Sequence, residues 1–499
     1  MAKVQLYVPP GGYMAERWWK TSMPPLGLLY IGAVLEQAHV PVEIVPTNVL
    51  GLGWKDIARK IAHDRPDIVG VTITTENRFQ SFKLIRIAKR AHPGALTVLG
   101  GPHASMAAED CLEHIPELDA VVRGEGEYAM LDICRAWEAS PKLESLAGIP
   151  GVVMRLDGRI HSAGMRPPIA DLDSLPFPAF HLVPFEKYHF TVPVPGRGER
   201  PAVNVMTSRG CPFNCSFCAT PINWGRHVRM RSPENVVREI ELLKARYGME
   251  VVFFYDDTFN ASPKRADAIS RLLIDRKVGV LIKCDVRLDI MSRESLELMK
   301  RAGLFHLSFG LEAGSDRVRR DIVGKQIEME DFHNLVRWCL ELDIVPNVFF
   351  IFSHPTETWA EAQETIRIIE QYKDRIEGTV AILHIYPGTP LERLALDTGF
   401  LPKDFTWTKR YRTKVITLPL AQGDVPLYID KLSWRQVSEL VLRWSLSAKK
   451  TSMLKKAPQA LRHVRSFGDL KRLIVMGLVY FRIKWGHVPN SRGEHGGRE

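Results

Sequence analysis

Short β-rich runs alternate with helix-like segments along most of this chain, and this alternation restricts its fold more than any other feature. In residues 1–140 the order is typical of a parallel sheet covered by helices on both faces. We therefore expect a doubly wound, Rossmann-like (flavodoxin-like) α/β domain there, with ligands beyond the carboxyl ends of the strands. The predicted strands are Val4–Val8, Val42–Pro46, Ile68–Thr74, Leu96–Gly100 and Ala120–Val122, and the predicted helices are Leu26–Gln37, Lys55–His63, Arg78–Arg90, Ala104–His114 and Glu127–Ala136.

A second series of strands and helices is predicted over residues 201–400. Six βα units favour a partial (β/α)6 barrel of the TIM type, with chemistry at the C-terminal ends of the strands. Residues 141–200 are rich in proline and predict a connector, and residues 401–499 predict a helical, basic C-terminal region with a disordered end. The predicted barrel strands are Val203–Met206, Val251–Tyr255, Leu281–Asp285, Leu307–Phe309, Asn347–Phe352 and Ala381–Ile385, with helices such as Pro233–Arg246 and Arg265–Asp275.

The basic charge of the chain gathers at its end. The formal net charge is +10, and from Lys449 onward twelve Lys and Arg face three Asp and Glu. Because the rest of the chain is nearly neutral, a nucleic-acid partner is not expected. The basic and apolar residues of this tail suit a soluble helical cap, a peripheral contact with an anionic membrane, or the docking of an acidic electron donor such as a flavodoxin or ferredoxin.

The two ends of the chain carry no recognisable targeting or membrane-spanning signal. The first twenty residues lack the apolar core of a secretory signal, and Leu473–Phe481 is too short to span a bilayer. Seven cysteines in a chain of 499 residues then indicate a reducing compartment. We expect a cytoplasmic protein without a transmembrane helix, with a peripheral position at the inner membrane surface as the alternative.

Three of the seven cysteines crowd into the segment SRGCPFNCSFCAT, directly after the first strand of the second series. The thiolates of Cys211, Cys215 and Cys218 suit three irons of a 4Fe-4S cluster and would leave the fourth iron open. Zinc is the rival metal. However, no neighbouring Cys or His completes a tetrahedral site at the usual spacing, since His227 lies nine residues beyond Cys218.

The spacing CxxxCxxC, with the aromatic Phe217 before the last cysteine, resembles the signature of the radical S-adenosylmethionine superfamily. The resemblance implies that S-adenosylmethionine chelates the open iron and is cut reductively to a 5′-deoxyadenosyl radical. In that family, polar residues at later strand ends hold the cofactor. Each matching residue here could equally be a cap or a salt-bridge partner. The matching residues are Asp256, Asp257, Asp285, Arg287 and Glu312.

Two later segments bear on this resemblance. After the fifth barrel strand the family often carries a glycine-rich turn of the type GxPGET, where the backbone approaches adenine. Here the text is FSHPTET, in which the turn Ser353 to Thr358 follows Phe352, without glycine, so the adenine contact must differ in detail. The segment YPGTPLE, Tyr386 to Glu392, is similar to the family's ending of the sixth strand.

Four motifs of the first domain, followed by a radical domain, resemble the cobalamin-binding subclass of the superfamily over about residues 1–400. They are PPLGLLYIGAVLE, PDIVGVTITT, VLGGPHAS and AVVRGEGE. The motif D-x-H-x-x-G is missing after the first strand, so a histidine that replaces the lower axial base of cobalt is not expected. The threonines and His103 could equally be ordinary strand and loop residues. The expected cobalamin contacts are Thr72, Thr74, Gly100, Gly101, His103, Gly124, Glu125 and Gly126.

The leading hypothesis is an enzyme that modifies, and most simply methylates, an unactivated carbon of a small molecule. The resemblance implies that the deoxyadenosyl radical abstracts hydrogen and that methylcobalamin provides the methyl group. The domain order is also similar to anaerobic magnesium-protoporphyrin monomethyl ester cyclase and to hopanoid-modifying proteins, so ring formation is an alternative. A non-catalytic protein that binds metal and corrinoid is a second alternative. A lipid, a tetrapyrrole or another natural-product intermediate remains open as the substrate, and no catalytic residue is assigned.

Overall fold

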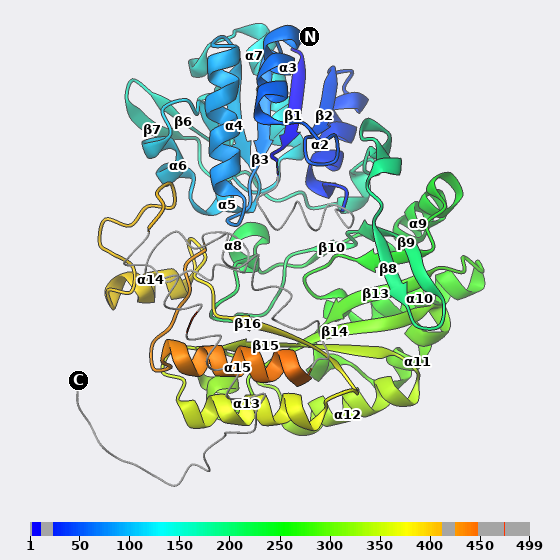
Figure 1. Ribbon diagram of the computed structural model, residues 1–499. Coiled ribbons are helices and arrows are strands. Elements are labelled where there is room, and N and C mark those ends of the chain that lie inside the picture. Colours follow the sequence, from blue (N-terminus) through cyan, green and yellow to red (C-terminus); the bar gives the residue numbers. More distant parts are fainter. Residues whose placement is uncertain (1, 11–22, 412–424, 448–473, 475–499) are drawn as a thin grey trace.

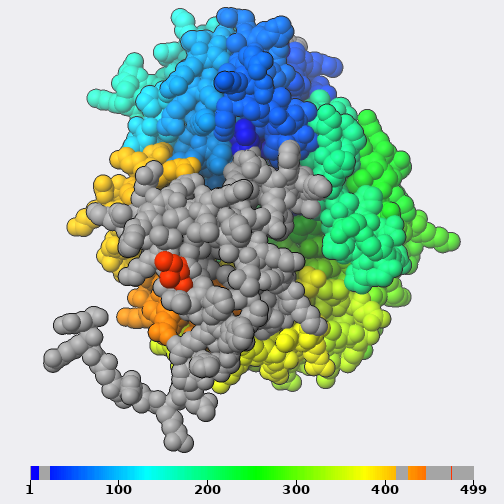
Figure 2. Space-filling model, in the orientation of Figure 1, coloured from blue at the N-terminus to red at the C-terminus, as the bar shows by residue number. Residues whose placement is uncertain are grey.

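The computed structural model describes residues 2–10, 23–411, 425–447 and 474. It has two α/β units, each built on its own sheet, stacked one on the other (Figure 1). Figure 2 shows the first unit, in blue, lying against the green and yellow second unit. A short helix of the second unit, α8 (Thr220–Trp224), lies between the two sheets in Figure 1. It follows the cysteine segment directly.

The first sheet has seven strands in the order β2-β1-β3-β4-β5-β6-β7. Its first five strands are parallel, as predicted, and β3 ends at Thr72, two residues earlier than expected. The strand bounds are β1 Val4–Val8, β2 Val42–Pro46, β3 Ile68–Thr72, β4 Leu96–Gly100, β5 Ala120–Val122, β6 Val152–Leu156 and β7 Arg159–Ser162.

Helices cover both faces of the first sheet. Leu6 and Tyr7 are neighbours on β1 but belong to different hydrophobic clusters, as the alternation of side chains along a strand requires. The predicted helix Ala104–His114 is two helices, because Ala107 leaves the helical conformation at φ −134° and ψ 39°. The helices are α2 Leu26–Gln37 and α7 Glu127–Ala139 on one face, and α3 Trp54–Asp64, α4 Arg78–Ala91, α5 Pro102–Met106 and α6 Ala108–His114 toward the other.

The segment predicted as a connector, residues 141–200, contains regular structure. Strands β6 and β7 form an antiparallel hairpin that extends the first sheet beyond β5. Its two-residue turn is Asp157-Gly158, with φ of 47° and 74°, the left-handed conformation that a tight hairpin needs. Strand β8 (Thr191–Val194) then pairs antiparallel with the first barrel strand. The segment thus contributes strands to both sheets, and the domain limits at 140 and 200 stay predictions.

The second sheet has the order β16-β15-β14-β13-β12-β9-β8, and all but β8 are parallel. Helices follow the strands in turn, which confirms the predicted partial barrel. The last strand lies earlier than predicted. The strands are β9 Gly198–Val205, β12 Val251–Phe254, β13 Leu281–Val286, β14 Leu304–Glu312, β15 Val345–Phe352 and β16 Glu377–Ile382, and the helices are α9 Pro233–Tyr247, α10 Pro263–Asp275, α11 Arg293–Ala302, α12 Met329–Glu341 and α13 Trp359–Gln371.

Two more helices follow the barrel, α14 (Pro390–Asp397) and α15 (Trp434–Ser447). Arg443 of α15 pairs with Glu370 of α13 at 2.8 Å, which fixes α15 against the barrel. The basic tail from Lys449 lies outside the described residues, except for Ile474. The predictions made for this tail, including its disordered end, therefore also fall outside the described residues. In the part of the chain that the structure describes, every helix is too short or too polar to cross a bilayer.

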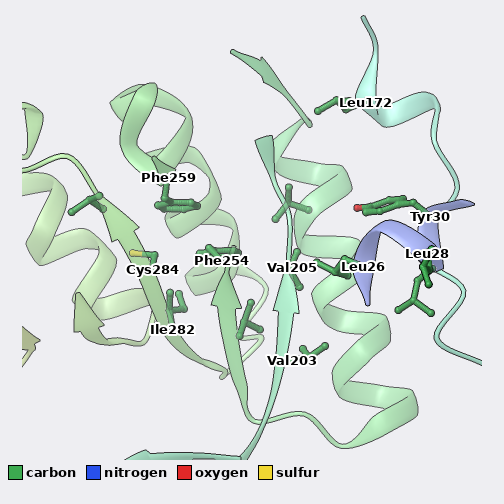
Figure 3. Close-up of a cluster of buried hydrophobic side chains, with 14 of the residues drawn as sticks. Leu26, Leu28, Tyr30, Leu172, Val203, Val205, Phe254, Phe259, Ile282 and Cys284 are labelled. Atoms are coloured by element: carbon green, nitrogen blue, oxygen red, sulfur yellow. The ribbon is translucent and has the colours of Figure 1, made fainter. Parts of the chain in front are cut away.

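The two largest hydrophobic clusters each contain residues of both units. Figure 3 shows Leu26 and Tyr30 of α2 near Val205 of β9, with Phe254 of β12 on the next strand. The rings of Phe254 and Phe259 stack at 4.4 Å between centroids. Because the two units share this buried surface, their relative position is fixed and their strand ends can form joint sites.

Candidate active site

The cysteine segment is a loop closed by two short strands. Strands β10 (Ser208–Arg209) and β11 (Arg229–Met230) pair antiparallel before and after it. Gly210 has φ +98°, and a Cβ there would lie 2.5 Å from the carbonyl oxygen of His227. A glycine is therefore needed for the two arms of the loop to approach each other.

All three cysteines line one pocket of about 200 Å³ at the C-terminal ends of β12, β13 and β14. Among the described residues, no three His, Cys, Asp or Glu side chains form a group that could hold a single metal ion. A cubane cluster does not need such convergence, because each thiolate binds a different iron. Side chains that line the pocket with the cysteines include Phe213, Phe217, Thr220, Asp257, Thr258, Asp285, Arg287, Ser308, Glu312, Lys325 and Phe349.

The sulfur atoms have polar neighbours. The backbone N–H of Thr220 donates to Cys218 Sγ at 3.5 Å, and the hydroxyl of Thr258 lies 3.5 Å from Cys211 Sγ. Burial raises the pKa of the Cys215 thiol, and the nearby positive charge of Lys325 opposes that rise. Hydrogen bonds and charges at the sulfurs are the means by which a protein tunes an iron–sulfur cluster.

Four of the five residues predicted to contact S-adenosylmethionine line this pocket, namely Asp257, Asp285, Arg287 and Glu312. Burial raises the pKa of Asp257 to about 6, although the hydroxyl of Thr220 donates to it at 2.9 Å. Burial likewise raises the pKa of Asp285 to about 6. Its Oδ1 is buried and has no hydrogen-bond partner within the described chain. An acceptor left open in this way fits a bound ligand with N–H or O–H groups.

The fifth residue, Asp256, does not line the pocket. Its carboxylate accepts from the backbone N–H of Thr207 at 2.6 Å, from the Thr207 hydroxyl, and from the Ser208 hydroxyl at 2.8 Å. Asp256 therefore fixes the strand that leads into the cysteine loop. The structure gives Asp256 a supporting position beside the pocket, and its contact with the cofactor stays a prediction.

Lys325 is a pocket residue that the sequence did not reveal. Its Nζ lies 2.5 Å from Glu312 Oε1 and 3.2 Å from the carbonyl oxygen of Gly310. Glu312 has φ +68°, at an irregular register between β14 and β15, which turns the strand end toward the lysine. In the same pocket the guanidinium of Arg287 lies 3.8 Å from the centre of the Phe213 ring.

The turn FSHPTET has no glycine, yet two of its residues adopt the left-handed backbone conformation, with φ of 71° at Ser353 and 61° at Thr356. Glu357 holds it, accepting from the N–H of Ser353 at 2.6 Å and of His354 at 3.0 Å. The His354 ring is tilted against Phe217 at 6.3 Å, and burial lowers its pKa to about 4. Within the described residues neither ring nitrogen has a hydrogen-bond partner. A buried, neutral histidine thus lies against Phe217 of the cysteine pocket, next to Ser353, which stands where the family often has the first glycine of this turn.

A second cavity, of about 380 Å³, lies between the two units at the strand ends of the first sheet. The second unit contributes Asn204, Met206, Arg209, Trp224 and Tyr255 to its wall. The buried Oδ1 of Asn204 lacks a partner among the described residues, so the cavity can satisfy a polar ligand group. Such a group suits the amide-bearing rim of a corrin ring. Six predicted cobalamin residues line this cavity: Thr72, Gly100, Gly101, Gly124, Glu125 and Gly126.

The other two predicted cobalamin residues, Thr74 and His103, do not line the cavity. The N–H of Thr74 donates to Asn77 Oδ1 at 2.8 Å within the loop after β3. His103 Nδ1 lies 3.1 Å from the Thr75 hydroxyl, and its ring packs against Trp407 at 5.8 Å. Burial lowers the pKa of His103 to about 3. The structure therefore places His103 in the core beside the cavity, not in its wall.

Comparison with known proteins assigns both halves of the chain. The profile of the Radical SAM superfamily matches residues 205–369, and that of the B12 binding domain matches residues 19–133. An uncharacterized methyltransferase of Pyrococcus horikoshii is 32% identical over 80% of this chain and 84% of its own length. An anaerobic magnesium-protoporphyrin IX monomethyl ester cyclase of Rubrivivax gelatinosus is 31% identical over 72% of this chain and 64% of the cyclase.

A solved structure shares the fold. It is the radical S-adenosylmethionine methyltransferase TsrM from Kitasatospora setae, with cobalamin and a 4Fe-4S cluster bound. It superposes with a TM-score of 0.71 over 96% of this chain and 99% of that protein, at 18% identity. At this identity the likeness concerns the fold only.

These matches confirm the predicted fold class, the resemblance and the enzyme assignment, and hopanoid methylases are among the relatives as well. The cofactors of such a chain are a 4Fe-4S cluster, S-adenosylmethionine and cobalamin, as predicted. The alternative of a non-catalytic protein that binds metal and corrinoid is therefore not supported. The chain belongs to the cobalamin-binding radical S-adenosylmethionine enzymes.

Proposed function

We propose that this enzyme methylates an unactivated carbon of a small molecule held where its two cavities meet. One observation carries the proposal. Tyr255, directly after β12, lines the cavity between the units, and Asp257, two residues further, lines the cysteine pocket. When bound, the cluster with S-adenosylmethionine supplies a radical and cobalamin supplies the methyl group. The chain itself must hold one carbon between both sites and exclude water.

We assign roles to the residues that line the two cavities. Cys211, Cys215 and Cys218 would bind the cluster. The open oxygen of Asp285 would accept a hydrogen bond from S-adenosylmethionine. The S-adenosylmethionine site would further include Asp257, Arg287, Glu312 and Lys325, and the cobalamin site Thr72, Gly100, Gly101, Gly124, Glu125, Gly126 and Asn204.

Polar groups of both units could orient the substrate. The Tyr386 hydroxyl donates to Glu76 Oε1 at 2.9 Å, which joins the loop after β3 to the segment after β16. Tyr255, in the wall of the cavity between the units, stays 48% exposed. We propose that Tyr255 and the Glu76–Tyr386 pair contact the substrate, which we assign to the lipids, tetrapyrroles or related natural-product intermediates.

We further propose that a flavodoxin or ferredoxin delivers the electron and that the enzyme works in the cytoplasm.

A peripheral contact with the inner membrane surface is the alternative to a freely diffusing enzyme. It would be made by the tail beyond Lys449, and it predicts that a chain shortened at residue 448 no longer sediments with anionic vesicles. The matched control is the full chain with neutral vesicles.

Anaerobic reconstitution with iron, sulfide and hydroxocobalamin tests the function. With a reductant and S-adenosylmethionine labelled in its methyl group, mass spectrometry should show 5′-deoxyadenosine and a labelled methyl group in the product. Each of Cys211→Ala, Cys215→Ala and Cys218→Ala should abolish deoxyadenosine formation. Cys339→Ala, a buried thiol outside the pocket, is the control and should retain it. Deoxyadenosine formation by all three loop variants would refute the assignment.

Ring formation is the second candidate, because a ring-forming cyclase is among the relatives. The same labelled cofactor separates the two reactions. A cyclase would yield 5′-deoxyadenosine and a ring-closed product without the label. A methylase would yield a product that carries the labelled methyl group.

A further inference from the structure

The base of the cysteine loop carries two buried arginines. Arg209 of β10 lies directly opposite Arg229 of β11 in the antiparallel register. Their side chains are only 4% and 5% exposed. Like charges opposite each other destabilise a strand pair, so this arrangement needs an anion between them.

That anion comes from the other unit. Arg209 lies 2.5 Å from Glu125 Oε1, and Arg229 lies 2.8 Å from both Glu125 oxygens. Arg209 also reaches Glu127 Oε1 at 2.5 Å. Glu125 lies in the loop after β5 and Glu127 is the first residue of α7; together with Gly126 between them, they line the cavity between the units. The network therefore ties the loop at the cobalamin cavity to the loop that holds the cysteines.

The aromatic surroundings make Arg209 a rigid part of the interface. Its guanidinium lies 5.3 Å from the ring of Tyr30, in the first unit, and 5.2 Å from the ring of Trp224, in α8 after the last cysteine. Buried ion pairs contribute little net stability compared with apolar packing, but they fix geometry. Arg209 stands two residues before Cys211, so these ion pairs join Glu125 and Glu127 directly to the start of the cysteine loop.

We propose that Glu125, Glu127, Arg209 and Arg229 form a positioning network that couples occupation of the cobalamin cavity to that of the cysteine pocket. This inference rests on the proposed function, in that a corrinoid and a cluster fill the two sites. Coupling between binding sites is reciprocal. A corrinoid that orders the loop after β5 therefore also orders the cysteine loop, and the assembled cluster strengthens corrinoid binding.

The test measures the dissociation constant of hydroxocobalamin, by equilibrium dialysis of the full chain, with and without a reconstituted cluster. The wild type should bind at least about 5-fold more tightly with the cluster, the lower end of typical coupling. Glu127→Gln and Arg209→Lys should bring the two constants toward equality while iron content stays at the wild-type level. Glu239→Gln, which alters a buried carboxylate paired with Arg231 inside the second unit, should keep the wild-type ratio.

A second measurement does not depend on affinity. In protein reduced to carry both a paramagnetic cluster and cob(II)alamin, pulsed electron paramagnetic resonance reports the spin–spin distance distribution, which should widen in Arg209→Lys but not in Glu239→Gln. Equal constants with and without cluster in the wild type would overturn the coupling and leave the proposed function intact. An unchanged ratio and distribution in both network variants would also overturn it. If hydroxocobalamin failed to bind the wild type at all, both the coupling and the proposed function would fall.

Discussion

Asp285 lies at the C-terminal end of β13, and its environment disfavours its charge. Burial raises the pKa of this carboxyl to about 6 from an unfolded value near 3.8. The folded chain therefore holds the proton to higher pH than the unfolded chain does. The free energy of unfolding consequently falls as the pH rises from about 3.8 to about 6. At neutral pH the charged Asp285 carboxylate therefore destabilises the ligand-free fold.

We predict that Asp285→Asn makes the metal-free chain more stable at neutral pH. Each unit of raised pKa corresponds to about 1.4 kcal/mol, so the gain should be about 1–3 kcal/mol at pH 7 and smaller at pH 5. The same variant should bind S-adenosylmethionine at least about 10-fold more weakly after cluster reconstitution, because a charge-assisted hydrogen bond is lost. Urea unfolding at the two pH values and equilibrium dialysis are the measurements. A variant less stable than the wild type at pH 7 would contradict the burial argument.

Single residues show how much of the candidate site could be predicted from the sequence. The cysteine spacing is local, so the three thiols were predictable together. Asp256 and Asp257 are neighbours, and only the fold decides that Asp257 enters the pocket while Asp256 holds Thr207. Lys325 was not predicted, because its contact with Glu312 depends on the turn at the end of β14 and on no local pattern.

At the level of elements, the cysteine loop depends on the close approach of its two arms at Gly210. We predict that Gly210→Ala takes up little iron on reconstitution. Its Cβ would lie 2.5 Å from the carbonyl oxygen of His227, and a backbone atom can move away only at a high energetic cost. Gly196→Ala is the matched control. Gly196 also has a positive φ, +70°, but its Cβ would meet nothing within 4 Å.

Both glycine variants should lose about 1 kcal/mol of stability from the left-handed backbone alone, which thermal unfolding would measure. Only Gly210→Ala should also lose iron and sulfide content. Equal iron loading of the two variants would contradict the prediction, because it would show that the cysteine loop still binds iron when its two arms are pushed apart.

Elements were predictable where a pattern marks them. Parallel strands of a sheet covered on both faces are short runs of mostly apolar residues, which is why β1, β2, β4 and β5 were located at their observed bounds. The hairpin β6–β7 carried its own signal, Asp157-Gly158, inside a stretch interpreted as a connector. Strands β10 and β11 have two residues each, too few for any periodicity, so the loop base could not be foreseen.

At the scale of the whole molecule, the order of the two units followed from the alternation of strands and helices, but their interface did not. Arg209 and Glu125 are 84 residues apart, and Tyr386 and Glu76 are 310 apart. Contacts at such separations leave no local pattern. The joint cavity could therefore be expected at the strand ends of the first sheet, while its second wall, from Asn204 to Tyr255, could not.

The shared core predicts that the two units unfold as one. Leu84 of α4 is fully buried in the first unit, and Leu335 of α12 is 1% exposed in the second. Each belongs to a hydrophobic cluster that contains residues of both units. Leu84→Ala and Leu335→Ala should each cost about 2–5 kcal/mol. Either variant should lower the protection of the slowest amides in both β4 and β14, because those amides exchange only through global unfolding.

Hydrogen–deuterium exchange with mass spectrometry can follow peptides of the two strands separately in both variants. If the units were independent, Leu84→Ala would lower protection in β4 alone and Leu335→Ala in β14 alone. Equal losses in both strands would instead mean that the first unit cannot open without the second. Any opening that admits the corrinoid must then be a local movement at the loops of the cavity, since separation of the units would unfold the chain.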